Sequence, residues 1–150
     1  MIEILIDADA CPVKDETYKV ALRHQVPVTL VSNSFMRVPG HPLIKHEVVS
    51  DGFDAADDRV VELAHNRSVV VTADILLAER ALKAKAIVLG PNGKPFTENS
   101  IGSAIATRAI MADLRAGGDQ IGGAAPFSKA DRSRYLSALD EALNQLKRGV

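Results

Sequence analysis

The stretch Glu3-Ile-Leu-Ile-Asp-Ala-Asp-Ala-Cys-Pro12 decides the fold of this chain. Its apolar residues run almost without interruption, which is typical of a strand that is covered on both faces. Two acids, Asp7 and Asp9, follow at once, and Pro12 then suits the first turn of a helix because its φ is fixed and it needs no N–H partner. A buried strand that ends in acids and leads into a helix favours a parallel α/β sheet.

The rest of the chain repeats this alternation of short β-branched runs and helical periods. The predicted strands are Glu3–Ile6, Val26–Val31, Glu47–Val49, Ser68–Val71 and Ala86–Leu89. The predicted helices are Pro12–His24, Ala55–Asn66, Ile75–Ala84, Ser100–Arg115 and Lys129–Lys147. After the turn Pro91-Asn-Gly93 a small extended segment is expected near Pro95–Thr97. The sequence therefore predicts an α/β fold around a central, mainly parallel sheet of about five strands.

Size and composition are those of one globular domain. The chain has 150 residues, of which 47% are hydrophobic and 25% charged. A chain of this length and composition can form a stable hydrophobic core without disulfides or structural metals. We expect a single domain over residues 1–150, with two C-terminal helices joined by the glycine-rich segment 117–126. No apolar stretch approaches the roughly 20 residues that span a bilayer, and the one cysteine, Cys11, cannot form an internal disulfide. We therefore expect a cytoplasmic protein with no membrane role.

Net charge limits the way in which this chain can bind nucleic acid. The formal net charge is −1 and the pI is near 6.4, so the whole molecule does not attract polyanions. Any contact with RNA must come from local clusters of Lys and Arg. The candidates are Lys14, Arg37, Arg59, Arg80 and Arg132.

Two acidic motifs close two of the predicted strands. Asp7-Ala-Asp9 follows the first strand, and Thr72-Ala-Asp74 follows Ser68–Val71. The carboxyl ends of parallel strands meet at one edge of the sheet, so these carboxylates can converge on one cation. A charge placed directly after a buried strand also needs compensation. The motifs predict a divalent-metal site, with Asp9 either in it or ahead of the next helix as a partner for its free N–H groups.

A third acidic run, Asp54-Ala-Ala-Asp57-Asp58, opens a predicted helix. Asp54 and Asp57 have the spacing of a capping box, so capping is at least as good an interpretation as chemistry for them. Asp58 needs no such role and lies on the same helix face as Asp54, toward the site or toward solvent. Asp74 has a second interpretation too, as the cap of the helix that begins at Ile75.

Other polar motifs carry weaker signals. Cys11 lacks an adjacent His and is better explained as a small buried thiol than as a nucleophile. Asn33, in Ser32-Asn33-Ser34, either contacts a phosphate or ends a polar loop. Ser128-Lys-Ala-Asp131 has the spacing of a capping box for the last helix.

Several motifs in a fixed order resemble the YaiI/YqxD family of bacterial proteins over essentially the whole chain. They are Asp7-Ala-Asp9-Ala-Cys11-Pro12-Val13-Lys14, Val31-Ser-Asn33-Ser34, Asp54-Ala-Ala-Asp57-Asp58, Val71-Thr72-Ala-Asp74-Ile-Leu-Leu-Ala78, and Pro126-Phe-Ser128 with Asp131-Arg132. More widely, the chain resembles PIN-like domains, metal-dependent nucleases of three α/β/α layers with acids at strand ends. This resemblance implies that Asp7 is the first-strand acid, Asp74 the acid of the Thr-x-Asp segment, and Asp58 the middle acid.

The leading functional hypothesis is an Mg²⁺- or Mn²⁺-dependent ribonuclease. Asp7, Asp58 and Asp74 would be the metal ligands, and Asp9 would complete the catalytic set by coordination or by positioning water. Lys14, Asn33 and Arg132 would contact the RNA backbone.

Two other functions stay open on the sequence. Asp-x-Asp after the first strand also resembles haloacid-dehalogenase phosphatases, in which Asp7 would attack phosphorus and Asp9 would protonate the leaving group. That superfamily has Thr after its second Asp, where this chain has Ala10-Cys11-Pro12. The remaining alternative is a non-catalytic RNA-binding module whose acids are structural or hold a metal only to order loops.

Overall fold

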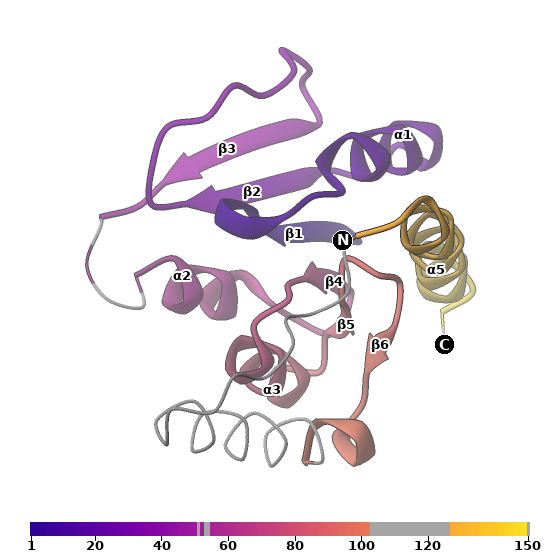
Figure 1. Ribbon diagram of the computed structural model, residues 1–150. Helices are drawn as coiled ribbons and strands as arrows, with labels where there is room; N and C mark the ends of the chain where they lie inside the picture. Colours follow the sequence, from indigo (N-terminus) through magenta and orange to yellow (C-terminus); the bar gives the residue numbers. More distant parts are fainter. Residues whose placement is uncertain (51, 53–54, 103–126, 150) are drawn as a thin grey trace.

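The computed structural model describes residues 1–50, 52, 55–102 and 127–149 (Figure 1). Six strands of this described part form one sheet, in the order β3-β2-β1-β4-β5-β6. They are β1 (Glu3–Asp7), β2 (Val28–Ser32), β3 (Ile44–Val48), β4 (Ser68–Val71), β5 (Ile87–Leu89) and β6 (Pro95–Phe96). β1 to β5 are parallel, and β6 pairs antiparallel with β5 at the edge. The predicted α/β fold with a mainly parallel sheet is confirmed, and the expected extended segment near Pro95 adds a strand to it.

Helices link β1 to β2, β3 to β4 and β4 to β5, and a long helix follows β6. They are the 3-10 turn η1 (Ala8–Ala10) and the α-helices α1 (Lys14–His24), α2 (Ala55–Leu63), α3 (Ile75–Lys83) and α5 (Lys129–Lys147). Residues 98–102 are helical as well, whereas the rest of the helix expected at Ser100–Arg115 and the glycine-rich segment 117–126 lie outside the described residues. In the part of the chain that the structure describes, every helix is too short or too polar to cross a membrane.

The sheet lies between two helical layers, each with its own apolar cluster. Successive side chains of a strand point to opposite faces. Ile4 and Ile6 accordingly join the cluster of α1 and α5, while Leu5 joins that of α2 and α3. Figure 1 shows the two helix pairs on opposite sides of the sheet. Because both faces are covered, β1 reads as a continuous apolar run in the sequence.

Helix α5 packs on α1 through a buried hydrogen-bonded pair. Tyr135 is fully buried, and its hydroxyl lies 2.6 Å from Thr17 Oγ1. Thr17 Oγ1 donates its single proton to the carbonyl of Val13 at 2.8 Å, so Tyr135 is the donor of the pair. Helix α5 begins with the predicted capping box, in which Ser128 and Asp131 accept each other's backbone N–H. Its bounds are those expected from the sequence because this cap is a local signal.

Two predicted N-terminal boundaries are wrong by two residues. Helix α1 starts at Lys14 and not at Pro12, because residues 8–10 form a 3-10 turn and Val13 is the N-cap. Strand β2 starts at Val28 and not at Val26, because the Val26 N–H closes α1 by donating to Ala21 O. Pro27, which comes next, has no N–H to give to the sheet.

Two further boundaries differ from those predicted, one because of strand pairing and one because of a local side-chain hydrogen bond. β3 begins at Ile44, ahead of the predicted Glu47, because Val28 and Ile44 are already paired across β2 and β3. Helix α2 ends at Leu63, before the predicted Asn66, where the His65 N–H donates to Ser68 Oγ instead of continuing the helix.

Candidate functional site

The carboxyl ends of β1 and β4 lie side by side. Asp7 is the last residue of β1, and Asp74 lies in the turn that follows β4. Ile6 pairs with Val71 in the parallel ladder, which puts Asp7 next to Thr72. Thr72 is 2% exposed, and its hydroxyl donates to Asp7 Oδ2 at 2.9 Å. Thr72 Oγ1 in turn accepts a hydrogen bond from the Asp74 N–H at 2.9 Å. One buried threonine therefore connects the strand end at Asp7 to the turn that carries Asp74.

Asp74 is held at the start of α3. Its Oδ1 accepts hydrogen bonds from the N–H groups of Leu76 and Leu77, at 2.9 and 3.2 Å. The predicted capping role is thus confirmed. Among the described residues no donor bonds to Oδ2, so capping leaves one oxygen of this carboxylate available to a ligand.

Asp9 belongs to η1 and binds the end of β2. Its Oδ2 accepts the Asn33 N–H at 3.0 Å, and Asn33 Nδ2 donates to Ser50 O at 2.9 Å. Val13, not Asp9, is the N-cap of α1, and α1 has no side-chain cap. The alternative that Asp9 serves the N–H groups of this helix is therefore wrong.

These residues line a cleft of about 480 Å³ at the carboxyl edge of the sheet. Its polar lining consists of Asp7, Asp9, Asn33, Asp57 and Asp74. Four carboxylates from η1, α2 and the ends of β1 and β4 thus face one cavity, as the strand-end motifs predict for Asp7, Asp9 and Asp74. Asn33, expected to contact phosphate, lies at the same cavity.

Asp7 is the electrostatically unusual member of the set. Burial raises the pKa of its carboxyl, and the hydrogen bond from Thr72 acts in the opposite direction. The negative charges of Asp74 and Asp9 raise the pKa of Asp7 further. A half-buried carboxylate near two others is the arrangement that a cation would relieve.

The structure does not bring Asp58 to this cleft. Asp58 is exposed, and its Oδ1 lies 2.9 Å from Arg80 Nη1 in an ion pair with α3. The neighbouring Asp57 lines the cleft instead. Consecutive residues of an α-helix point about 100° apart, so only one of the two can face the strand ends. Asp54, considered as a helix cap, lies outside the described residues.

The basic residues considered for RNA contact divide into two groups. Three arginines are occupied by ion pairs within the protein. The pairs are Arg59 with Glu47, Arg80 with Asp58, and Arg132 with Glu16. Arg132 also donates to the carbonyl of Pro12 at 2.8 Å, so it fastens α5 to the start of α1. Lys14 and Arg37 line a second cavity, described below.

The sequence missed two members of the site. Asp57 was not selected because helix capping explained it equally well. The spacing of residues within one helix also does not show which of two adjacent acids faces the sheet. Thr72 had a usable signal, because it is the first residue after a buried strand and precedes Asp74 by two positions. Its contact with Asp7 depends on the pairing of β1 with β4, which are 65 positions apart in the sequence at these residues.

The cleft as described is not a closed metal cage. Across the described residues, no three side chains of the His, Cys, Asp and Glu types are grouped so that they could hold a metal ion. Mg²⁺ usually binds through one or two carboxylates, with waters and substrate phosphates completing its coordination. The carboxylate oxygens that line the cleft fit that mode of binding.

Comparison with known proteins identifies the family of this chain but names no reaction for it. The family model described as "Uncharacterized BCR, YaiI/YqxD family" matches residues 5–145. A UPF0178 protein of Sphingopyxis alaskensis is 70% identical over 148 residues, covering 98% of this chain and 96% of the relative. One from Paramagnetospirillum magneticum is 55% identical over 150 residues, covering 100% of this chain and 99% of the relative. No solved structure matches the chain.

Proposed function

We propose that this chain, which belongs to the YaiI/YqxD family, is a divalent-metal-dependent ribonuclease that acts at its acidic cleft. The names of the family and of its UPF0178 members state no reaction, so the proposal depends on the site alone. One observation carries it: four carboxylates converge on one cleft at the carboxyl edge of a parallel sheet, and the one that ends β1 has a raised pKa.

The carboxylates nearest to the strand ends are the proposed metal ligands. Asp7 and Asp74 would bind Mg²⁺ or Mn²⁺ directly, with Asp57 and Asp9 reaching it through water. When bound, the metal lowers the pKa of its water and offsets the charge that develops on a phosphoryl group. One or two direct carboxylates, with waters and phosphate oxygens from the substrate completing the coordination, agree with the open donor set of the cleft.

The protein's own contribution is to hold these carboxylates in place before a ligand arrives. Thr72 orients Asp7 through one hydrogen bond and receives another from the Asp74 backbone. The first turn of α3 fixes Asp74, and the Asn33 N–H fixes Asp9. Groups that are fixed in advance need no reorganisation when charge develops in the reaction.

The sheet order supports the wider PIN-like expectation with one change of residue. A parallel β3-β2-β1-β4-β5 arrangement places the ends of β1 and β4 together at its centre, where the expected acids stand. Asp57 takes the part of the middle acid that the sequence suggested for Asp58, because Asp57 lines the cleft. Fold-level analogy supports the reaction class only together with this site.

Neighbouring substitutions on α2 give a matched test. Purified protein is incubated with single-stranded RNA and Mn²⁺, and cleavage is followed by gel electrophoresis. We expect Asp7→Asn to lower the cleavage rate by about 100-fold or more, as removal of a group that stabilises transition-state charge does. Asp57→Asn lowers it as well, while Asp58→Asn, one residue away and paired with Arg80, leaves it within about twofold.

Three outcomes would overturn the proposal. Cleavage that survives Asp7→Asn would exclude the acidic cleft as the active site. A covalent phosphate trapped on Asp7 would assign the chain to the phosphatase alternative. RNA affinity without turnover, with Mg²⁺ or Mn²⁺, would leave the non-catalytic module as the function.

A further inference from the structure

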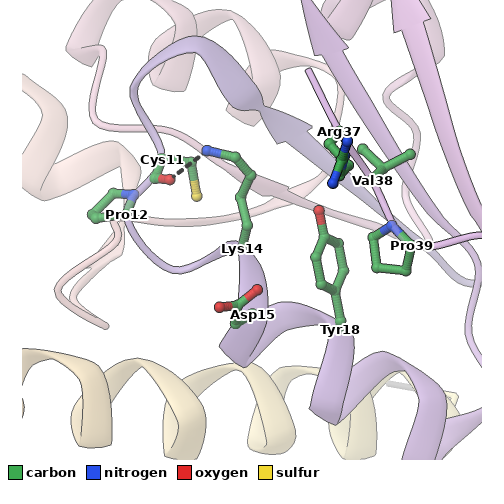
Figure 2. A pocket seen from close by; sticks show the side chains of 8 residues that line it. All are labelled: Cys11, Pro12, Lys14, Asp15, Tyr18, Arg37, Val38 and Pro39. Carbon is green, nitrogen blue, oxygen red and sulfur yellow. Dashed lines mark hydrogen bonds between the residues drawn. The ribbon is translucent and has the colours of Figure 1, made fainter.

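A second cavity, of about 500 Å³, opens where the start of α1 meets the loop between β2 and β3 (Figure 2). We call it the basic pocket. The residues with charged or hydroxyl groups in its lining are Lys14, Asp15, Tyr18 and Arg37. Pro12 and Pro39 contribute rigid apolar walls. Its volume lies in the range of small-molecule sites, about 300–1,000 Å³.

Arg37 stands out among the arginines of residues 1–50, 52, 55–102 and 127–149 because it has no ion pair or hydrogen bond there. Each of the other arginines in the described part of the chain makes an ion pair or a hydrogen bond, whereas none involves Arg37. A guanidinium carries five N–H donors in a planar fork that matches phosphate oxygens. An exposed arginine with no partner in the described protein, lining a cavity, is suited to an anionic ligand.

Lys14 brings a second positive charge that is already positioned. Its Nζ donates to the carbonyl of Cys11 at 2.9 Å, which folds the side chain over the turn before α1 (Figure 2). An ammonium has three donors, so two remain for a ligand. The hydrogen bond thus restrains the side chain without using up its capacity.

Tyr18 supplies a neutral donor between these charges. Burial, and then the charge of Asp15, raise the pKa of Tyr18 to about 12, so its hydroxyl keeps its proton at neutral pH. In Figure 2 this hydroxyl points toward Arg37. The pocket therefore offers ammonium, guanidinium and phenol donors to one ligand.

The net charge of the basic pocket indicates whether a phosphodiester or a phosphomonoester is the better ligand. Lys14 and Arg37 are positive and Asp15 is negative, so these groups together leave one positive charge in a chain whose net charge is −1. A backbone phosphodiester carries one negative charge, whereas a phosphomonoester carries about 1.5 to 2 near neutral pH. The pocket is better matched to the phosphodiester.

The basic pocket and the acidic cleft adjoin each other along the chain. Asp9 lines the cleft and Cys11 lines the pocket. Two residues of chain place their Cα atoms at most about 7.6 Å apart. A nucleic-acid strand of a few nucleotides can therefore reach from one to the other.

We propose that Lys14, Arg37 and Tyr18 form a subsite for a backbone phosphate of the RNA strand that the acidic cleft cleaves. This proposal rests on the proposed function, which identifies the bound strand as RNA. The subsite also explains how a protein with a net charge of −1 can bind RNA. The RNA backbone is bound by one local cluster of hydrogen-bond donors next to the acidic cleft.

Metal-free binding tests the subsite separately from turnover. A fluorescein-labelled single-stranded RNA hexamer is titrated with the full chain in EDTA, and fluorescence anisotropy gives the Kd at several salt concentrations. We expect Arg37→Gln to weaken binding by about tenfold or more, as loss of a charge-assisted hydrogen bond does. It also lowers the salt slope of log K by about 0.7, the value for one lost phosphate contact on a single strand.

Lys19→Gln is the matched control. Lys19 lies on α1, is exposed, and does not line the basic pocket. Lys19→Gln therefore removes one positive charge, as Arg37→Gln does, but leaves the subsite intact. We expect its Kd to stay within about twofold of wild type. Unchanged affinity in Arg37→Gln, or an equal loss in both variants, overturns the subsite.

Two further arms separate the possible failures. If inorganic phosphate binds with an affinity that depends on Arg37 while RNA affinity does not, the pocket takes free phosphate and the strand assignment is wrong. RNA cleavage that survives Asp7→Asn, with binding still dependent on Arg37, would reject the acidic active site and retain the phosphate subsite.

Discussion

Asp7 is a half-buried carboxylate whose negative charge is disfavoured by the neighbouring acids. Its pKa is raised by burial and by the charges of Asp74 and Asp9. For an acid with a raised pKa, the folded state holds a proton that the unfolded chain has already released in the interval between the two pKa values. The free energy of unfolding therefore falls as the pH rises from the ordinary pKa of 3.8 through the raised value. Above that interval the full destabilisation persists.

Asp7→Asn should therefore stabilise the metal-free protein at neutral pH. Asparagine carries no charge, and its Oδ1 can accept the hydrogen bond that Thr72 donates to Asp7. We expect a higher Tm than wild type at pH 7.5, with a difference that shrinks below pH 4, measured by calorimetry in EDTA. Asp15→Asn, at an exposed carboxylate, should give no such gain. An equal or lower Tm for Asp7→Asn at pH 7.5 would contradict the electrostatic description of the site.

At the residue scale, strand-end acids were predictable and the helical acid was not. Asp7 ends a buried run and Asp74 lies three positions after another, so their place at the sheet edge depends only on local order along the chain. Asp57 and Asp58 both belong to α2, and the choice between them depends on the rotation of that helix about its axis. Packing of Ala56 and Val60 in the cluster on that face of the sheet decides this rotation.

At the scale of elements, the turn after β5 fits against α5 with no space for a side chain. Gly93 has φ +83°, and a Cβ there would lie 2.5 Å from the backbone carbon of Arg134. Such a distance forces the backbone to move. Only glycine accepts both the left-handed conformation and the close approach.

Gly93→Ala should accordingly destabilise the protein. We expect a loss of about 2–4 kcal/mol in the free energy of unfolding, from backbone strain and steric overlap together. Urea denaturation followed by circular dichroism measures it. Gly40→Ala is the control, since no described atom lies within 4 Å of a Cβ at that position, and it should change the free energy by less than about 0.5 kcal/mol. Similar values for the two variants would refute the close approach.

The hydrogen bond between α1 and α5 gives a second test at this scale. Tyr135 donates to Thr17 Oγ1 in a fully buried setting. Tyr135→Phe keeps the ring and removes this donor, so we expect a loss of about 1 kcal/mol. Tyr18→Phe, in which no described hydrogen bond is removed, serves as the comparison in the same urea experiment. If Tyr135→Phe unfolds at the wild-type midpoint, the pair contributes no stability.

At the scale of the whole molecule, metal binding should appear as stability. A ligand that binds only the folded state adds about 2.7 kcal/mol at one hundred times its Kd. For a domain of this size that corresponds to a rise in Tm of roughly 5–10 °C. We expect this shift for wild type in Mn²⁺ and for Asp58→Asn, whose carboxylate lies outside the cleft.

Asp7→Asn should lose most of the Mn²⁺-induced shift, because the variant lacks the charge that the ion would neutralise. Differential scanning calorimetry with and without Mn²⁺ measures both proteins under the same conditions. The absence of a shift in wild type would contradict metal binding by the free protein. An equal shift in wild type and Asp7→Asn would place the ion elsewhere.

The sequence by itself determined the elements and the chemistry available at their ends. Strand and helix patterns depend on neighbours a few positions apart, which is why β4 and α5 were predicted with their observed bounds. Tertiary structure alone decided which of two adjacent acids faces the cleft, that Thr72 connects Asp7 to Asp74, and that Arg37 and Lys14 line one cavity. Each of these depends on strand pairing or helix packing between distant segments, and such contacts leave no periodic signal in the chain.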